Sequence, residues 1–346
     1  MGKRVREFGS DFNLCTDQKW LDSNSSFFNS EASHFFLSGR AALYALIEFG
    51  IKKHGWIKVY LPSFYCHEVT DYIKSLSIEI INYTYNPLND IKVEVFDTGP
   101  SVIVKVDYFG FGISRNIHIN QENTLVIEDL THNLSGIKNS TSDYGFASLR
   151  KELPIPTGGL IFSNKNKELP KGSLNTVAND IAQRKLTAMH LKTMYLENKF
   201  SDKPFFRTLF LDAEVDFESS LANAINPELS NAIINGLNIS KILKVKKDNL
   251  KLILDQLVVD ENFTILNTYA NLGFGLVLKA KTQKQRNNLK DYLIKNLIFP
   301  AILWPHQYEE IDVALENTIL FIHSDFRYNK NQITQICQKI NLFFNN

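Results

Sequence analysis

One lysine near the middle of the chain stands in a setting that suits amine chemistry. Lys151 follows Ser148 in a Ser-x-x-Lys arrangement and precedes two prolines and a Gly-Gly pair, within the segment 143–160. This many turn-forming residues predicts a shaped loop rather than a long helix or a buried strand. A lysine amine held in such a loop can condense with an aldehyde, most commonly pyridoxal phosphate (PLP). A solvated surface loop is the plainer interpretation of an isolated Ser-x-x-Lys motif.

A site for PLP also needs a place for the phosphate group. Ser38, Gly39 and Arg40 open a run of small and apolar residues at helical spacing, which predicts a helix capped by Ser38. Free backbone N–H groups and the positive end of the helix dipole at such a start suit a phosphate. The alternative is that Ser38 only caps a core helix.

A carboxylate that follows an apolar run is a second candidate for cofactor chemistry. Asp129 comes just after the predicted strand Thr124–Ile127, where it could keep a pyridine nitrogen protonated. A helix N-cap or a strand-end turn is its other interpretation. His132 could contact Asp129 or the phenolic oxygen of the cofactor, or be an ordinary satisfied polar group.

Short apolar runs alternate with helical or turn segments through this part of the chain. The predicted strands are Lys58–Leu61, Ile78–Tyr83, Ser101–Val106 and Thr124–Ile127. Such alternation predicts βαβ units and a mostly parallel sheet, in an α/β fold. Ligands gather at the carboxyl ends of parallel strands, where the loops Pro62–His67, Asp107–Gly110 and Glu128–His132 should lie.

The length of the chain predicts one large and one small domain. At 346 residues it exceeds the roughly 100–200 residues of a typical domain. We expect a large cofactor-binding domain over 1–210, with an irregular N-terminal arm over 1–35, and a small C-terminal α/β domain over 211–346. The boundary is placed where Asp, Glu and Ser interrupt the apolar pattern, over Asp212–Ser220.

Composition excludes several classes of partner. The 38 basic and 37 acidic side chains nearly balance, so nucleic acid and anionic membrane are not expected partners. The sequence has no apolar stretch of about 18 residues and no signal peptide. Its three cysteines form no CxxC pair and no metal-like cluster with histidine, which predicts reduced thiols, no metal site and a cytoplasmic location.

Several of these segments together resemble a known family. Ser38-Gly39-Arg40-Ala41-Ala42-Leu43, Leu61-Pro62-Ser63-Phe64, Val126-Ile127-Glu128-Asp129 with His132, and Ser148-Leu149-Arg150-Lys151 occur in the order found in fold-type-I PLP enzymes. The chain most resembles the DegT/DnrJ/EryC1/StrS aminotransferases. This resemblance implies a large domain with a mostly parallel, seven-stranded type of sheet between helices, and a small C-terminal α/β domain.

The resemblance also implies roles for individual residues. Lys151 matches the Schiff-base lysine, Asp129 the partner of the pyridine nitrogen, and His132 a contact of the cofactor ring or its oxygen. Gly39 and Arg40 match the phosphate-binding amides, and Ser148 would add a hydroxyl because Phe146 stands where relatives carry serine. Cys66 takes the position of the usual stacking aromatic, so Tyr65 or His67 is a candidate for that contact.

The implied activity is amino transfer from an amino acid to a carbonyl acceptor, with a nucleotide-linked keto-sugar as the family precedent. Lys151 would be the base that moves the proton from the alpha carbon of the amino donor to the cofactor. Because fold-type-I enzymes are generally dimers, the resemblance also implies a homodimer. Arg327 or Arg150 is a candidate for binding a substrate carboxylate or phosphate, with a solvated surface position as the alternative. Two other functions stay open: a different PLP reaction such as decarboxylation, elimination or C–C cleavage, and a non-catalytic binding or regulatory protein.

Overall fold

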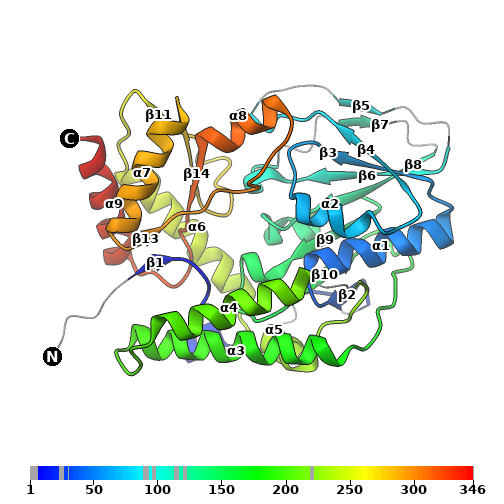
Figure 1. The fold of residues 1–346 in the computed structure, drawn as a ribbon, viewed down its shortest axis with the longest axis horizontal. Coiled ribbons are helices and arrows are strands. Elements are labelled where there is room, and N and C mark those ends of the chain that lie inside the picture. The colour runs from blue at the N-terminus through cyan, green and yellow to red at the C-terminus, as the bar shows by residue number, and fades with distance from the viewer. Residues whose placement is uncertain are drawn as a thin grey trace. The chain divides into compact units, whose positions relative to one another are not determined.

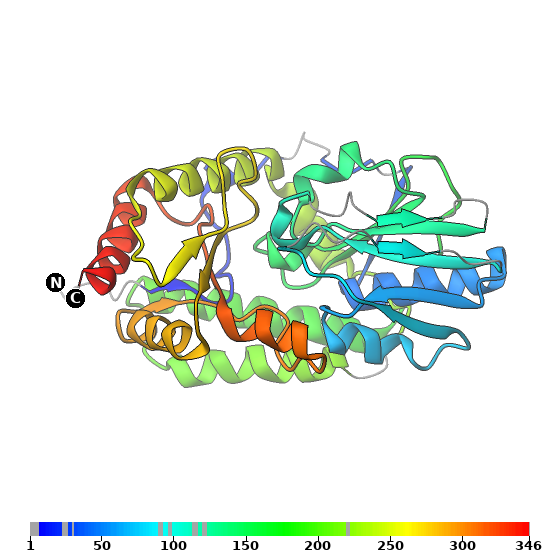
Figure 2. The same ribbon diagram turned by 90° about the horizontal axis from the view of Figure 1, so that it is seen from above.

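The computed structural model describes residues 7–22, 27–29, 31–88, 93–95, 99–112, 117–119, 123–218 and 222–345. The chain forms two compact units, which Figures 1 and 2 draw from two directions. The sheet unit contains residues 12–108 and 113–239, and the C-terminal unit contains residues 1–11, 109–112 and 240–346. Parts of the predicted N-terminal arm and the end of the Asp212–Ser220 segment lie outside the described residues.

The sheet unit is built on seven strands in the order β2-β10-β9-β8-β6-β3-β4. Their bounds are Ser33–Phe36 (β2), Lys58–Pro62 (β3), Glu79–Tyr83 (β4), Ser101–Val106 (β6), Thr124–Asp129 (β8), Tyr144–Ser148 (β9) and Gly159–Phe162 (β10). The pairs from β9 to β4 are parallel, and β10 runs antiparallel to both β9 and β2. A mostly parallel seven-stranded sheet is thereby confirmed. The separate strands β5 (Val93–Val95) and β7 (Ile117–Ile119) pair in parallel.

Within the described residues of the sheet unit, five α-helices accompany this sheet. They are α1 (Gly39–His54), α2 (His67–Ile73), α3 (Thr176–Leu196), α4 (Lys203–Glu218) and α5 (Glu228–Gly236). The run of buried Ala and Leu residues after Gly39 makes α1 a core helix, and it ends at Gly55 in the left-handed conformation, with φ of 67°. The helices α3 and α4 lie side by side as a hairpin (Figure 1), held by a cluster that includes Met189, Phe206 and Phe210.

The C-terminal unit has a smaller antiparallel sheet in the order β11-β12-β14. These strands are Phe263–Ile265, Leu276–Ala280 and Ile319–Ile322, and the helices are α6 (Ile239–Gln256), α7 (Gln283–Lys295), α8 (Glu310–Thr318) and α9 (Lys330–Phe344). The N-terminal strand β1 (Phe8–Gly9) pairs in parallel with β13 (Ile298–Phe299). Residues up to Asp11 therefore belong to this unit rather than to the large domain that the sequence predicts.

The predicted domain boundary near residue 210 falls inside α4, and the compact units meet in sequence at residues 239–240 instead. Two acidic residues of the predicted boundary segment have partners within the sheet unit. Glu214 pairs with Arg150, and Asp216 pairs with Arg184 of α3. Because the buried Phe210 and Phe217 also face inward, α4 is an integral part of the sheet unit.

The segment around the lysine is also more ordered than the sequence predicts. Tyr144–Ser148 is the buried strand β9, and the loop is confined to the residues between Ser148 and Gly159. Gly145 faces Phe162 across the β9–β10 ladder. A Cβ there would stand 2.1 Å from the Phe162 ring, so glycine is present to make room for that ring.

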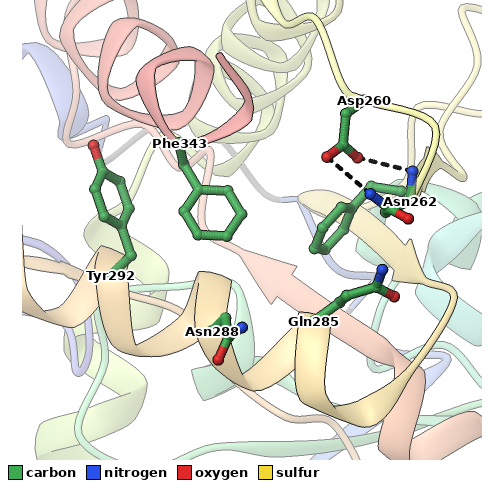
Figure 3. A pocket seen from close by; sticks show the side chains of 7 residues that line it. Asp260, Asn262, Gln285, Asn288, Tyr292 and Phe343 are labelled. Atoms are coloured by element: carbon green, nitrogen blue, oxygen red, sulfur yellow. Dashed lines mark hydrogen bonds between the residues drawn. The ribbon is translucent and has the colours of Figure 1, made fainter. Parts of the chain in front are cut away.

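The C-terminal unit carries a surface hollow of about 340 Å³ (Figure 3). Gln285, Asn288 and Tyr292 line it from α7, Phe343 lines it from α9, and Asp260 bonds Asn262 at its rim. None of the site residues predicted from the sequence lines this hollow. Among the described helices, none has both the length and the apolar composition needed to cross a membrane.

Candidate active site

The backbone around Lys151 is fixed, whereas its side chain is accessible. Leu149–Lys151 forms a 3-10 turn (η5) directly after β9, and Leu149 N–H donates to the Gly158 carbonyl at 3.0 Å. Every residue from Glu152 to Leu160 is buried, while Lys151 is exposed. The Glu152 carboxylate also accepts a hydrogen bond from Leu134 N–H at 3.0 Å. The loop thus presents one amine from an otherwise anchored segment.

The surroundings of this amine favour its neutral form. The pKa of Lys151 is lowered from its ordinary value, first because surrounding protein displaces water from the charged amine and second because Arg150 is a neighbouring cation. Glu214, Cys66 and Glu68 act in the opposite direction. The side chain retains accessible surface, so the lowered pKa reflects the protein around it rather than complete enclosure. A lysine with these properties is suited to nucleophilic and base chemistry.

The start of α1 and the end of β9 form a narrow cradle. Ser38 caps the helix, and its Oγ accepts from Ala41 N–H at 3.2 Å. A Cβ on Gly39 would lie 2.9 Å from the Ser148 Cβ, so the absence of a side chain lets these segments approach. The first N–H groups of an α-helix have no partner within the helix, which makes this cradle suitable for an anion.

Replacing Gly39 by alanine should damage this cradle selectively. Its new methyl group would force Ser148 or the helix start to move, and we expect roughly tenfold weaker binding of a phosphate-bearing ligand. Isothermal titration with PLP measures the change. The matched control is Gly236→Ala in α5, where an added Cβ would meet nothing within 4 Å. Equal affinities of the two variants would contradict a role for the cradle.

Asp129 lies buried at the carboxyl end of β8 with both carboxylate oxygens engaged. Oδ1 accepts from Thr131 N–H at 2.9 Å, and Oδ2 accepts from the Tyr65 hydroxyl at 2.7 Å. Burial raises the pKa of Asp129, although both hydrogen-bonding residues act to lower it. The buried carboxylate would be stabilised by a cation, and each of its oxygens can accept more than one hydrogen bond.

The loop after β3 supplies Tyr65 and Cys66. Tyr108 fixes this loop, because its hydroxyl donates to the Phe64 carbonyl at 2.5 Å and its ring stacks near the Phe64 ring at 5.9 Å. Tyr65 is buried, and its hydroxyl donates a hydrogen bond to the Asp129 carboxylate. Cys66 is half-buried, and burial followed by the charge of Glu68 raises the pKa of its thiol, while Lys151 lowers it.

The remaining predicted residues have different surroundings. His132 is buried in the turn after Asp129. Arg40 is buried at the start of α1, with its guanidinium 3.7 Å from the Glu68 carboxylate. His67 begins α2 and is half-buried.

Arg150 and Arg327 are both held by carboxylates. Arg150 makes a two-pronged contact with Glu214, at 2.7 and 3.0 Å. Arg327 makes a similar contact with Asp325, at 2.9 and 2.7 Å, and also donates to the carbonyls of Ser10 and Asp11. Arg327 therefore joins the N-terminal segment to the rest of the C-terminal unit, and its substrate contact stays a prediction.

The fold thus brings most of the predicted residues into one unit, and it adds two that sequence reasoning missed. Thr131 links Asp129, the candidate partner of a ring nitrogen, with Ser148, the candidate phosphate ligand. Its N–H donates to the Asp129 carboxylate, and its Oγ1 accepts from Ser148 N–H at 3.0 Å. Glu214 approaches the lysine turn through Arg150. The position of Thr131 between Asp129 and His132 could have identified it, whereas nothing local in the sequence connects Glu214 with Lys151.

The chain matches known proteins by its structure and not by its sequence. No protein-family model matches the sequence, and no curated protein matches it. Solved structures do match, including a protein from Streptococcus pneumoniae provisionally assigned as a sugar aminotransferase, in its PLP form. It is 12% identical, with a TM-score of 0.59 and 99% coverage of both chains.

Two further structures share the fold. A DegT/DnrJ/EryC1/StrS aminotransferase from Brucella abortus has a TM-score of 0.51 at 13% identity, covering 91% of this chain and 86% of its own. DesI, solved with its TDP-sugar product, has a TM-score of 0.55 at 11% identity, covering 94% and 86%. The chain therefore has the α/β fold of these solved structures, as the sequence resemblance implies.

Proposed function

We propose that this protein is a PLP-dependent aminotransferase of the DegT/DnrJ/EryC1/StrS type. The observation that carries the proposal is the convergence, within the sheet unit, of an accessible lysine of lowered pKa, a buried carboxylate and a helix start that faces Ser148. These are an amine, a partner for a ring nitrogen and a phosphate cradle. The shared fold supports the same conclusion.

The residues present fit the cofactor. The close approach of Gly39 to Ser148 places the start of α1, whose first N–H groups suit a phosphate, beside the Ser148 side chain. The raised pKa of Asp129 marks a buried carboxylate that a protonated pyridine nitrogen would stabilise. Ser38, Gly39, Arg40 and Ser148 would hold the phosphate, and Asp129 and His132 would face the ring. Cys66 is a departure, because it offers less surface for stacking than an aromatic residue.

Each residue then has a defined task. When bound, PLP supplies an aldehyde for amines and a ring that accepts the electron pair left when a proton leaves the amino donor. Lys151, with its pKa lowered, moves that proton from the donor's alpha carbon. The Asp129 carboxylate would hold the ring nitrogen in its charged form. Tyr65 and Thr131 keep the carboxylate oriented through their hydrogen bonds.

The acceptor we propose is a nucleotide-linked keto-sugar. DesI was solved in the presence of its TDP-sugar product. The pneumococcal neighbour has been solved in its PLP form and in its pyridoxamine phosphate (PMP) form. The amino-carrying form of a cofactor is the half-way state of transamination, which favours amino transfer over the other PLP reactions. We also propose a homodimer and a cytoplasmic location, the latter supported by three cysteines that form no disulfide.

The products of a single half-reaction test the proposal. Purified protein loaded with PLP and mixed with glutamate or another candidate amino donor, without acceptor, should yield one keto acid per cofactor and no carbon dioxide or ammonia. Release of carbon dioxide or ammonia in that proportion would support the alternative PLP reactions. Failure to bind PLP at all would support the non-catalytic binding or regulatory function.

A further inference from the structure

Helix α4 reaches the lysine turn through a compact set of charges. The carboxylate of Glu214 accepts from both terminal nitrogens of Arg150, at 2.7 and 3.0 Å. Lys185 of α3 adds a contact to the same carboxylate at 2.5 Å. One carboxylate is thus shared by two cations directly beside the residue that carries the proposed reactive amine.

A buried aromatic ring completes this set. Phe217, one helical turn after Glu214, lies 4.9 Å from the Arg150 guanidinium carbon and 5.0 Å from the Lys185 amine. Cations over an aromatic face are attracted to it, and burial strengthens the attraction. The Arg150 and Lys185 side chains are only 15% and 6% exposed, so the geometry is constrained by packing as well as by charge.

We propose that Glu214 and Phe217 are positioning residues, which hold Arg150 beside Lys151 and so set the charge around the reactive amine. The proposal rests on the amine chemistry assigned to Lys151 above. It assigns α4 a part in tuning the site, in addition to packing on α3. Glu214 and Phe217 act through Arg150.

Each charge near Lys151 shifts the pKa of its amine in a definite direction. Arg150 lowers the pKa of the Lys151 amine, while Glu214 raises it. Cys66 and Glu68, from the segment at the start of α2, also raise it. Glu214 itself is held ionised, because Arg150 and Lys185 outweigh the effect of its burial and lower the pKa of its carboxyl. Arg150 and Glu214, the two partners of one ion pair, therefore shift the pKa of the Lys151 amine in opposite directions.

The experiment measures the free-amine fraction of Lys151 without cofactor. The wild type and each variant are treated with a limiting amount of isotopically labelled acetic anhydride at a series of pH values. Acetylation of the peptide that contains Lys151 is then quantified by mass spectrometry. Below the pKa of the amine, Glu214→Gln should increase labelling about threefold to tenfold, and Arg150→Gln should decrease it by a similar factor. Phe217→Leu should change it less than either.

Matched variants separate charge from loosened structure. Arg150→Lys retains a cation and should keep labelling closer to the wild-type level than Arg150→Gln does. Asp71→Asn breaks the exposed pair with Lys74 in α2 and should leave Lys151 labelling unchanged. Circular dichroism identifies any variant that fails to fold, and Glu214→Gln, the closest in shape to the native residue, then decides the question.

Opposite shifts in the two glutamine variants would support the proposal. Shifts in the same direction, or labelling equal to that of Asp71→Asn, would overturn it, because simple loosening of the turn would move both variants alike. The measurement needs no bound PLP. A protein that shows the opposite shifts yet fails to bind PLP would thus refute the proposed enzyme while leaving the role of Glu214 intact.

Discussion

Replacement of Lys151 by alanine is expected to reduce keto acid formation from an amino donor at least about a thousandfold. The change removes both the nucleophile and the base, while the phosphate cradle and Asp129 remain. The variant should therefore still bind PLP without a covalent bond. The rate of keto acid release under single-turnover conditions measures the loss, and equilibrium dialysis measures the retained binding.

The exposed position of Lys151 makes this a clean experiment. Because the side chain packs little, its truncation should leave thermal unfolding close to that of the wild type. Lys165, which forms a partly exposed ion pair with Asp143, offers a control lysine in the same unit, and Lys165→Ala should keep full activity. Activity within tenfold of the wild type in Lys151→Ala would remove this residue from the mechanism.

Asp129→Asn should separate activity from stability. The amide keeps an acceptor for Thr131 N–H and can donate to the Tyr65 hydroxyl, but it cannot hold a protonated ring nitrogen. We expect at least roughly a hundredfold loss of transamination rate. The cofactor-free variant should unfold at the same temperature as the wild type or higher at pH 8, because it no longer buries a carboxylate charge.

The dependence on pH follows from the raised pKa of Asp129. Its folded form binds a proton more tightly than its unfolded form, so this residue contributes less stability as pH rises through its folded pKa. The difference in unfolding free energy between Asp129→Asn and the wild type should therefore increase from pH 4 to pH 8. Urea unfolding at several pH values tests this, and a difference that shrinks as pH rises would contradict the assigned burial cost.

The sequence predicted the parallel sheet and α1 well, because buried strands and capped helices leave local patterns. Strand β8 and helix α1 appear close to their predicted bounds. The prediction failed at β9, the strand that contains Gly145, because the segment 143–160 was expected to form a loop. The reason for that glycine is the Phe162 ring on the neighbouring strand, and a contact made across a sheet leaves no local trace.

Charged residues were the second source of error. Glu214 and Asp216 lie in the segment predicted as the domain boundary, yet both belong to α4 and pair with Arg150 and Arg184 within the sheet unit. Arg327, which stays a candidate substrate contact, has a carboxylate partner in Asp325, two residues earlier. Likewise, the bond between Tyr65 and Asp129 joins residues far apart in sequence. Residue type alone therefore did not predict which partner each charged side chain has, because those partners are set by the fold.

The most direct test of the central claim is the site of covalent attachment of PLP. Protein incubated with PLP and reduced with sodium borohydride is digested, and the modified peptide is identified by mass spectrometry. The account predicts one equivalent of cofactor per chain, on Lys151, accompanied by loss of the visible absorbance band. Modification spread over surface lysines, or unchanged labelling in Lys151→Ala, would contradict it.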